Sequence, residues 1–131
     1  MSTIKTETLS TPSNATVPVD TVVNGTAKAW VNFNGTGTVA IRRAFNVSSI
    51  TDNAEGTYTV NFTTAMPDAN YSATASSGTN HATSVFSAND GGHCSVYHYT
   101  TNSVRIITGT YGEGITNNFS DAEAVSVSIF S

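Results

Sequence analysis

Apolar and polar residues alternate along the stretch from Thr26 to Phe62, and this alternation constrains the fold more than any other feature. At positions 27–33, small and apolar side chains occupy every second position, with lysine, tryptophan and asparagine between them. A period of two is typical of a β-strand with two different faces. The pattern returns at positions 39–47 and again at 58–62. The stretch therefore predicts a three-stranded antiparallel meander.

Two turn signals separate these three strands. Residues 34–37 read Asn-Gly-Thr-Gly and residues 52–56 read Asp-Asn-Ala-Glu-Gly. Glycine and asparagine tolerate the positive φ angles that tight reversals need. Arg43 falls on the nominally apolar side of the second strand. We therefore expect a carboxylate partner for it, or a place at a subunit interface.

The rest of the chain continues in strands, with no helical periodicity longer than one turn. The expected elements are a fourth strand from Tyr71 through Ala75, a loop at 76–81, a short strand at 82–88, a turn at 89–92, a hairpin of 93–100 with 103–110, a loop at 111–120 and a closing strand at 125–130. About seven to eight strands at such spacing are typical of an antiparallel β-sandwich or jelly roll. The sequence therefore predicts one all-β domain at residues 26–131.

Residues 1–25 differ from that domain in composition. Serine, threonine, proline and asparagine dominate, and Pro12 and Pro18 oppose both a continuous helix and a central strand. One interpretation is a frayed leader or linker. The other is an extended arm that docks on a neighbouring subunit or on a larger particle, using the spaced apolar residues Val17, Val19, Val22 and Val23.

Composition limits the classes of partner. Of 131 residues only 11% are charged, the net charge is −4, and only five residues are lysine or arginine, which argues against nucleic acid. A strand-rich chain with few apolar residues to bury favours a homo-oligomer, and we expect a trimer.

The single cysteine excludes an intrachain disulfide, and no apolar run approaches the ~20 residues that span a bilayer. The N-terminus lacks the apolar core of a signal peptide.

The central stretch also resembles a known module. The residues that carry the likeness are Ala27–Arg42 (AKAWVNFNGTGTVAIR), Phe45–Asn53 (FNVSSITDN), Gly56–Phe62 (GTYTVNF), Met66–Tyr71 (MPDANY) and Val125–Phe130 (VSVSIF). Together they resemble the C-terminal β-module of tailed-bacteriophage tail-fibre and tail proteins. The resemblance implies a virion protein, made in the host cytoplasm and exposed on the particle, with other virion proteins as partners and no catalytic residues. The module normally ends a longer fibre, whereas here it nearly fills a chain that starts at Met1, which favours a small separate virion component.

His93, Cys94 and His98 form the cluster closest to a metal site. In a regular strand Cys94 and His98 share one face while His93 points to the other, so one chain offers at most two ligands, whereas zinc needs three or four. A site on a threefold axis can collect one histidine from each subunit. The alternative, which we favour, is that the histidines make ordinary hydrogen bonds and that Cys94 packs as a small apolar residue. No metal or cofactor is therefore expected.

The sequence gives little indication of an active site. The acidic residues fall almost entirely in expected turns, where turn chemistry accounts for them: Asp52, Glu55, Asp68, Asp90, Glu113 and Asp121. Nothing in their spacing indicates the facing carboxylates of a glycosidase. The Gly-x-Ser-x-Gly elbow and the phosphate loop are both missing from the sequence. We expect a protein that is not an enzyme.

Aromatic residues supply the best candidate for binding. Sugars present apolar faces that lie on aromatic rings, and the candidate contacts for a glycan or another receptor are Trp30, Tyr97, Tyr99, Tyr111 and Asn117, with Arg105 beside them. Trp30 has a second interpretation, because aromatic residues are also enriched in subunit interfaces. We expect adhesion to a host surface, through loops at 76–81, 89–92 and 111–118. The alternative is a capsid-decorating or head-fibre protein held to the shell by residues 1–25.

Overall fold

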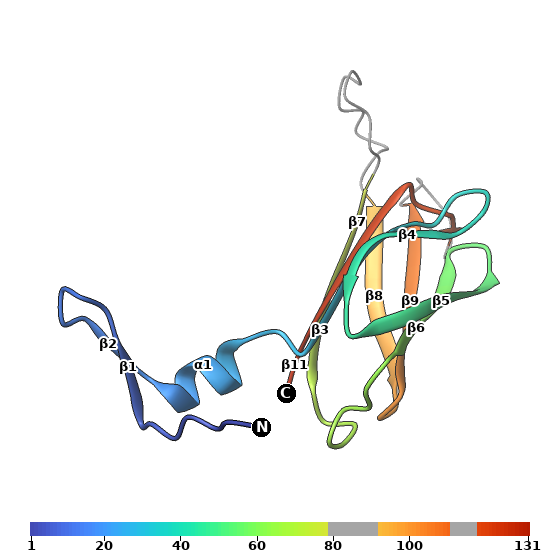
Figure 1. The fold of residues 1–131 in the computed structure, drawn as a ribbon. Helices are drawn as coiled ribbons and strands as arrows, with labels where there is room; N and C mark the ends of the chain where they lie inside the picture. Colours follow the sequence, from blue (N-terminus) through green and yellow to red (C-terminus); the bar gives the residue numbers. More distant parts are fainter. Residues whose placement is uncertain (79–91, 111–117) are drawn as a thin grey trace.

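The computed structural model of the chain describes residues 1–78, 92–110 and 118–131. Two antiparallel sheets pack face to face, after a small hairpin and a short helix (Figure 1). This arrangement confirms the expected β-sandwich. The elements are β1 (Thr8–Ser10), β2 (Thr16–Pro18), α1 (Val19–Gly25), β3 (Ala29–Asn34), β4 (Ala40–Phe45), β5 (Val47–Ala54), β6 (Thr57–Phe62), β7 (Ser72–Gly78), β8 (Gly92–Tyr99), β9 (Ser103–Thr110), β10 (Asn118–Phe119) and β11 (Ala124–Phe130).

Each sheet draws on strands that are distant in sequence. The first, here called the β3 sheet, has the order β4-β3-β11-β7. The second, the β6 sheet, has the order β5-β6-β9-β8, and the two-residue β10 pairs with the end of β9. The closing strand β11 lies between β3 and β7, so the two ends of the domain sequence meet in the middle of one sheet.

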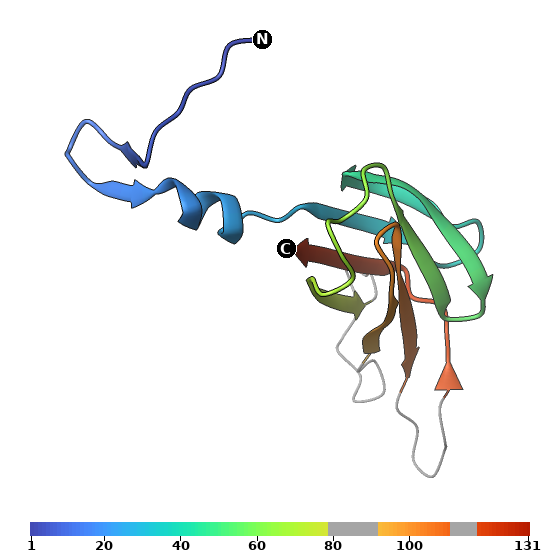
Figure 2. The ribbon, with the colours of Figure 1, turned by 90° about the horizontal axis from the view of Figure 1, so that it is seen from below.

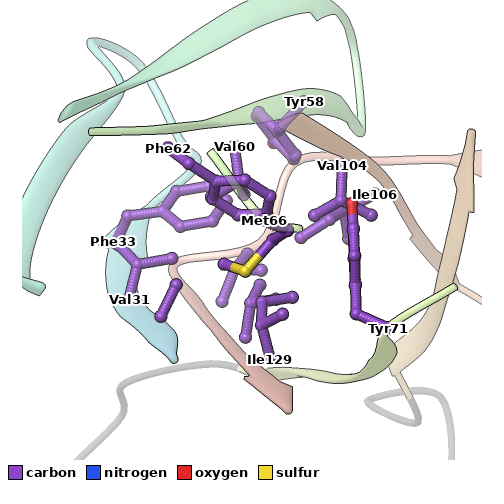
Figure 3. Close-up of a cluster of buried hydrophobic side chains, with 13 residues drawn as sticks. Val31, Phe33, Tyr58, Val60, Phe62, Met66, Tyr71, Val104, Ile106 and Ile129 are labelled. Carbon is purple, nitrogen blue, oxygen red and sulfur yellow. The ribbon is translucent and has the colours of Figure 1, made fainter. Parts of the chain in front are cut away.

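The core lies between the two sheets (Figure 3). Every second residue of β3, β6 and β11 is buried, as period-two alternation requires. The ring of Phe33 from one sheet meets that of Tyr58 from the other edge-to-face, with centroids 5.2 Å apart. The buried apolar side chains are Ala29, Val31, Phe33, Tyr58, Val60, Phe62, Met66, Tyr71, Val104, Ile106, Val125, Val127 and Ile129.

The expected three-stranded meander is wrong in one respect: the chain changes sheet at Asn46. The β3–β4 hairpin belongs to one sheet and the β5–β6 hairpin to the other. Asn46 has a φ of 53°, and its amide donates to the carbonyls of Lys28 and Thr64 and accepts from Thr64 N. Asparagine tolerates this left-handed backbone better than most residues, so it forms the corner where the chain crosses.

An irregularity in the β3–β4 pairing decides where Arg43 points. The register shifts between Asn32 and Phe33, so that Phe33 pairs with Ile41 and Asn32 with Arg43. Arg43 therefore lies on the outer face of the sheet, where it is exposed. A buried carboxylate is not required. The turn before β4 forms as expected, with Gly37 at a φ of 62°.

Hydrogen bonds around Tyr58 close one end of the sandwich. Its hydroxyl lies 2.7 Å from Asp121 Oδ1, to which it donates, and Asp121 Oδ1 also accepts from the backbone N–H of Gly56 at 2.7 Å. Gly56 has a φ of 63°, and a Cβ there would meet Thr108 O at 2.4 Å. The β5–β6 turn, β9 and the segment before β11 are thereby joined, which holds the two sheets in place.

The remaining strand expectations are largely confirmed. β8 and β9 form the predicted hairpin, β11 is the predicted closing strand, and β7 starts where expected. β7 continues to Gly78, however, so residues 76–78 are strand rather than loop, and residues 118–119 of the expected loop at 111–120 form β10. The strand expected at 82–88 lies outside the described residues.

Residues 1–25 fold away from the sandwich (Figures 1 and 2). β1 and β2 pair through three residues each, and α1 follows directly after Pro18. The sequence did not predict this helix of seven residues. The helix begins directly after Pro18, and proline is tolerated at the start of a helix. Within the described ranges, no helix has the length and hydropathy that crossing a membrane requires.

Candidate functional site

Trp30 lies on the outer face of the β3 sheet. Its neighbours in sequence, Ala29 and Val31, point into the core, whereas Trp30 is 36% exposed. Phe45 of β4 stands directly opposite it in register and is 54% exposed. Ser128 of β11 flanks Trp30 on the other side. The sheet thus presents two large aromatic rings to solvent at neighbouring positions.

Arg43 follows on the same face. It pairs in register with Asn32, whose amide donates to Ser126 Oγ at 2.9 Å. Directly opposed residues on a sheet have Cβ atoms about 4.5–5.5 Å apart, and diagonal neighbours about 7–8 Å. We refer to the surface made by Trp30, Asn32, Arg43, Phe45, Ser126 and Ser128 as the aromatic–arginine face.

This face belongs to a sheet without carboxylates. The four strands of the β3 sheet contain no aspartate or glutamate, and their only charged residues are Arg42 and Arg43. The chain as a whole carries a net charge of −4. The charge of the β3 sheet is therefore positive, opposite in sign to the net charge of the whole protein.

Tyr97 and Arg105 lie on the other side of the sandwich. They face each other in register on β8 and β9, in the β6 sheet. Next to them, β5 and β6 carry a ladder of polar side chains that bond to one another, with Asn53 Nδ2 donating to Thr59 Oγ1 at 2.8 Å and Asn61 Nδ2 to Thr51 Oγ1 at 2.9 Å.

Tyr99 lies apart from both Trp30 and Tyr97. The register shifts between Tyr97 and Tyr99, where His98 has a φ of 51°. Tyr99 then stands opposite buried Val104, and its ring contacts that of Tyr71 with centroids 5.3 Å apart. Trp30, Tyr97 and Tyr99 consequently do not build one surface. The other two candidate contacts, Tyr111 and Asn117, lie outside the described residues.

The same irregularity changes the histidine cluster. Cys94 packs against the core, whereas His98 is exposed, so the expectation that these two share a face is wrong. Within residues 1–78, 92–110 and 118–131, no group of three or more metal-ligating side chains comes together. Burial raises the pKa of the Cys94 thiol to about 11, despite a hydrogen bond from Ser77 that lowers it. Such a thiol stays protonated at neutral pH, as expected for a packed side chain.

Two of the acidic residues have structural partners. Asp121 accepts from Tyr58 and from the backbone N–H of Gly56. Asp68 Oδ1 accepts from the N–H of Asn70 at 2.6 Å, which is the local bond of an Asx turn. Asp90 and Glu113 lie outside the described residues.

None of the four valines of the expected arm is fully buried. Val17 and Val19 are half-buried, while Val22 and Val23 on α1 are exposed, and α1 buries none of its residues. The sandwich core contains no residue from positions 1–25. The apolar side chains of this segment therefore contribute little to the fold of the chain itself.

Two residues of the aromatic–arginine face were missed as binding candidates in the sequence. Phe45 and Arg43 alternate with Ala44, which packs towards the core, and that alternation was the available signal. It could be interpreted only once the pairing with β3 was known. No protein-family model, curated protein or solved structure significantly matches the chain.

Proposed function

We propose that the chain is a structural protein of a bacteriophage particle, displayed on its surface and adhering to the host cell. The observation that carries this proposal is the division of the molecule into two parts. A sandwich buries its own core, and a segment of 25 residues outside that core exposes its apolar side chains. Residues 1–25 anchor the protein to the particle. The sandwich, residues 26–131, is presented outward. The chain assembles as a trimer.

The positions of the strand ends support outward display. The segment from α1 enters the sandwich at the start of β3, next to the end of β11 (Figure 1). Gly78, Gly92 and Thr110 lie at the opposite end of the sheets, as the pairing of Gly78 with Ala124 requires. Anchoring through residues 1–25 would therefore leave that end, and both outer faces, accessible to a cell surface.

The chemistry of the outer faces supports adhesion to a glycan. Exposed aromatic rings, amides and hydroxyls are the groups that contact sugars. The outer face of the β3 sheet carries the exposed rings of Trp30 and Phe45, and both outer faces carry amides and hydroxyls. The carboxylates of Asp121 and Asp68 make structural contacts, and we propose no catalytic step for the protein.

Capsid decoration is the second candidate, and one observation favours it. Leu9, Val22 and Val23 are all exposed in a segment that has its own secondary structure. A shell-binding arm would use such exposed apolar side chains to contact the shell. Both roles use residues 1–25 as the anchor, and they differ in where the protein sits and in what the sandwich contacts.

Copy number separates the two roles. Quantitative mass spectrometry of purified particles, against the major capsid protein, gives the number of chains per particle. A few to a few tens would support a tail or fibre position and adhesion, whereas hundreds would support decoration. If the protein is missing from purified particles, both roles are wrong.

Adhesion needs its own test. The purified full-length chain should bind host cells and reduce adsorption of the phage in competition. The matched control is a chain denatured and refolded without regaining its β-sheet spectrum. Full adsorption in the presence of saturating folded protein would contradict the adhesive role.

A further inference from the structure

We propose that the aromatic–arginine face binds an acidic sugar residue of a cell-surface glycan, with Arg43 pairing to the sugar carboxylate and Trp30 and Phe45 lying against the sugar rings. This inference rests on the adhesive role proposed above. It adds the chemical class of the ligand and the residues that select it.

The positive charge of the β3 sheet favours an anionic ligand. The strands of the β3 sheet carry two arginines and no carboxylate, in a chain whose net charge is −4. A local positive face in an acidic protein raises the local concentration of anions. The acidic charge of the whole chain opposes long polyphosphates such as nucleic acid, which rely on many basic contacts. A single acidic group on a mostly neutral ligand suits this face better.

Arg43 is the basic group available for such a ligand. Arg42 donates to the carbonyl of Phe33 at 3.3 Å. Lys28 Nζ donates to the carbonyls of Val23 and Thr26. Among the described residues, Arg43 has no hydrogen bond or ion pair and its side chain is exposed. A guanidinium in this state can form the bidentate pair with a carboxylate that lysine cannot reproduce.

The neighbours of Arg43 fit a sugar rather than a simple anion. Trp30 and Phe45 offer apolar ring surface for the C–H face of a pyranose. Asn32, Ser126 and Ser128 add one amide and two hydroxyls on the same face, suited to the hydroxyl groups of a sugar. Aromatic surface, polar groups and one cation thus occur side by side on a single sheet.

The test measures binding of the full-length chain to polysaccharide purified from the host cell surface. One sample is native, and in the other the carboxylates are reduced to alcohols. We expect Arg43→Gln to weaken binding to the native polysaccharide by about tenfold, with Arg43→Lys intermediate. Trp30→Ala and Phe45→Ala should weaken binding to both samples. Wild-type protein should bind the reduced sample about as weakly as Arg43→Gln binds the native one.

The β6 sheet supplies matched controls. Arg105 and Tyr97 are an arginine and an aromatic residue in register on the opposite outer face. Arg105→Gln and Tyr97→Ala should leave binding unchanged, and thermal unfolding of each variant checks that it is folded. An equal loss in Arg105→Gln would overturn the assignment to this face.

Other results would overturn the inference. Binding that ignores carboxylate reduction would show that no acidic sugar is selected. A shift to a smaller oligomer in Trp30→Ala or Phe45→Ala, measured by sedimentation, would show that the face is an interface between copies. Wild-type protein that binds neither cells nor polysaccharide would defeat the adhesive role itself, whereas wild-type binding that Arg43→Gln leaves intact would defeat only this inference.

Discussion

The N-terminal segment and the sandwich differ in how far their apolar side chains are buried. The sandwich covers its apolar residues with two sheets, so that Phe33, Tyr58 and Ile106 are fully buried. Residues 1–25 contain a two-stranded hairpin and a short helix, and the large apolar residues there, such as Leu9 and Val23, are exposed.

The difference shows where each part obtains its stability. A lone two-stranded hairpin is at best marginally stable in water, and isolated helices shorter than about 12–15 residues are also marginal. Burial in the sandwich does not support either element, since β1, β2 and α1 contain no buried residue. The sandwich is therefore stabilised by its own core, whereas we expect the N-terminal segment to need a partner surface to hold its structure.

The largest effect should come from the sandwich core. Phe33→Ala removes a fully buried ring that meets Tyr58, and should lower the free energy of unfolding by about 3–5 kcal/mol. Phe45→Ala is the matched control, because Phe45 is exposed on the neighbouring strand, and we expect a change of no more than ~1 kcal/mol. Urea unfolding measures both. Equal losses would contradict the assignment of inner and outer faces.

A smaller effect should follow from alkaline pH. Burial and the hydrogen bond to Asp121 raise the pKa of Tyr58 above its ordinary value of 10.0, and burial raises that of Tyr71. A pKa raised on folding means that the stability is fully present below the unfolded value and falls as the pH rises towards the folded one. The free energy of unfolding should therefore decline above about pH 10.

Tyr58→Phe isolates the contribution of that hydroxyl to the decline. The variant should be less stable at neutral pH by about 1–2 kcal/mol, since a buried hydrogen bond is lost. Its stability should also fall less steeply than that of the wild type in alkali. A decline of the same steepness would mean that another group is responsible.

The smallest effect on stability should come from residues 1–25. Val22→Ser with Val23→Ser alters two exposed side chains of α1, and the free energy of unfolding should change by no more than ~0.5 kcal/mol. Attachment to the particle should nevertheless be lost. Ile41→Ser is a matched control, since Ile41 is 38% exposed on the sandwich and Val22 is 39% exposed. A destabilised α1 variant would show that the segment packs on the sandwich.

Much of the fold could be predicted from the sequence, because alternation reports directly which side of a strand is buried. The inward positions of β3 and the β8–β9 hairpin follow from that rule. The crossing at Asn46 could not be predicted, because apolar residues continue at Phe45 and Val47 as though one strand ran through them. Membership of a sheet is a long-range property, and local periodicity does not report it.

The candidate site was only partly predictable for a related reason. Trp30 stands out by its residue type and its place between inward residues. Arg43 was misplaced, because a shift of register between β3 and β4 moves it to the outer face. The shift at His98 likewise separated it from Cys94. Such irregularities depend on how two strands pair, so neither strand alone predicts them.

Hydrogen–deuterium exchange of the full-length chain, alone and bound to the particle, tests most directly whether residues 1–25 depend on a partner. Amides of β1, β2 and α1 should exchange at close to the rate of an unfolded chain when the protein is alone, and should become protected on the particle. Amides of β3, β6 and β11 should be protected in both states. Protection of residues 1–25 in the isolated protein, or their continued rapid exchange on the particle, would show that the segment does not depend on the particle for its structure.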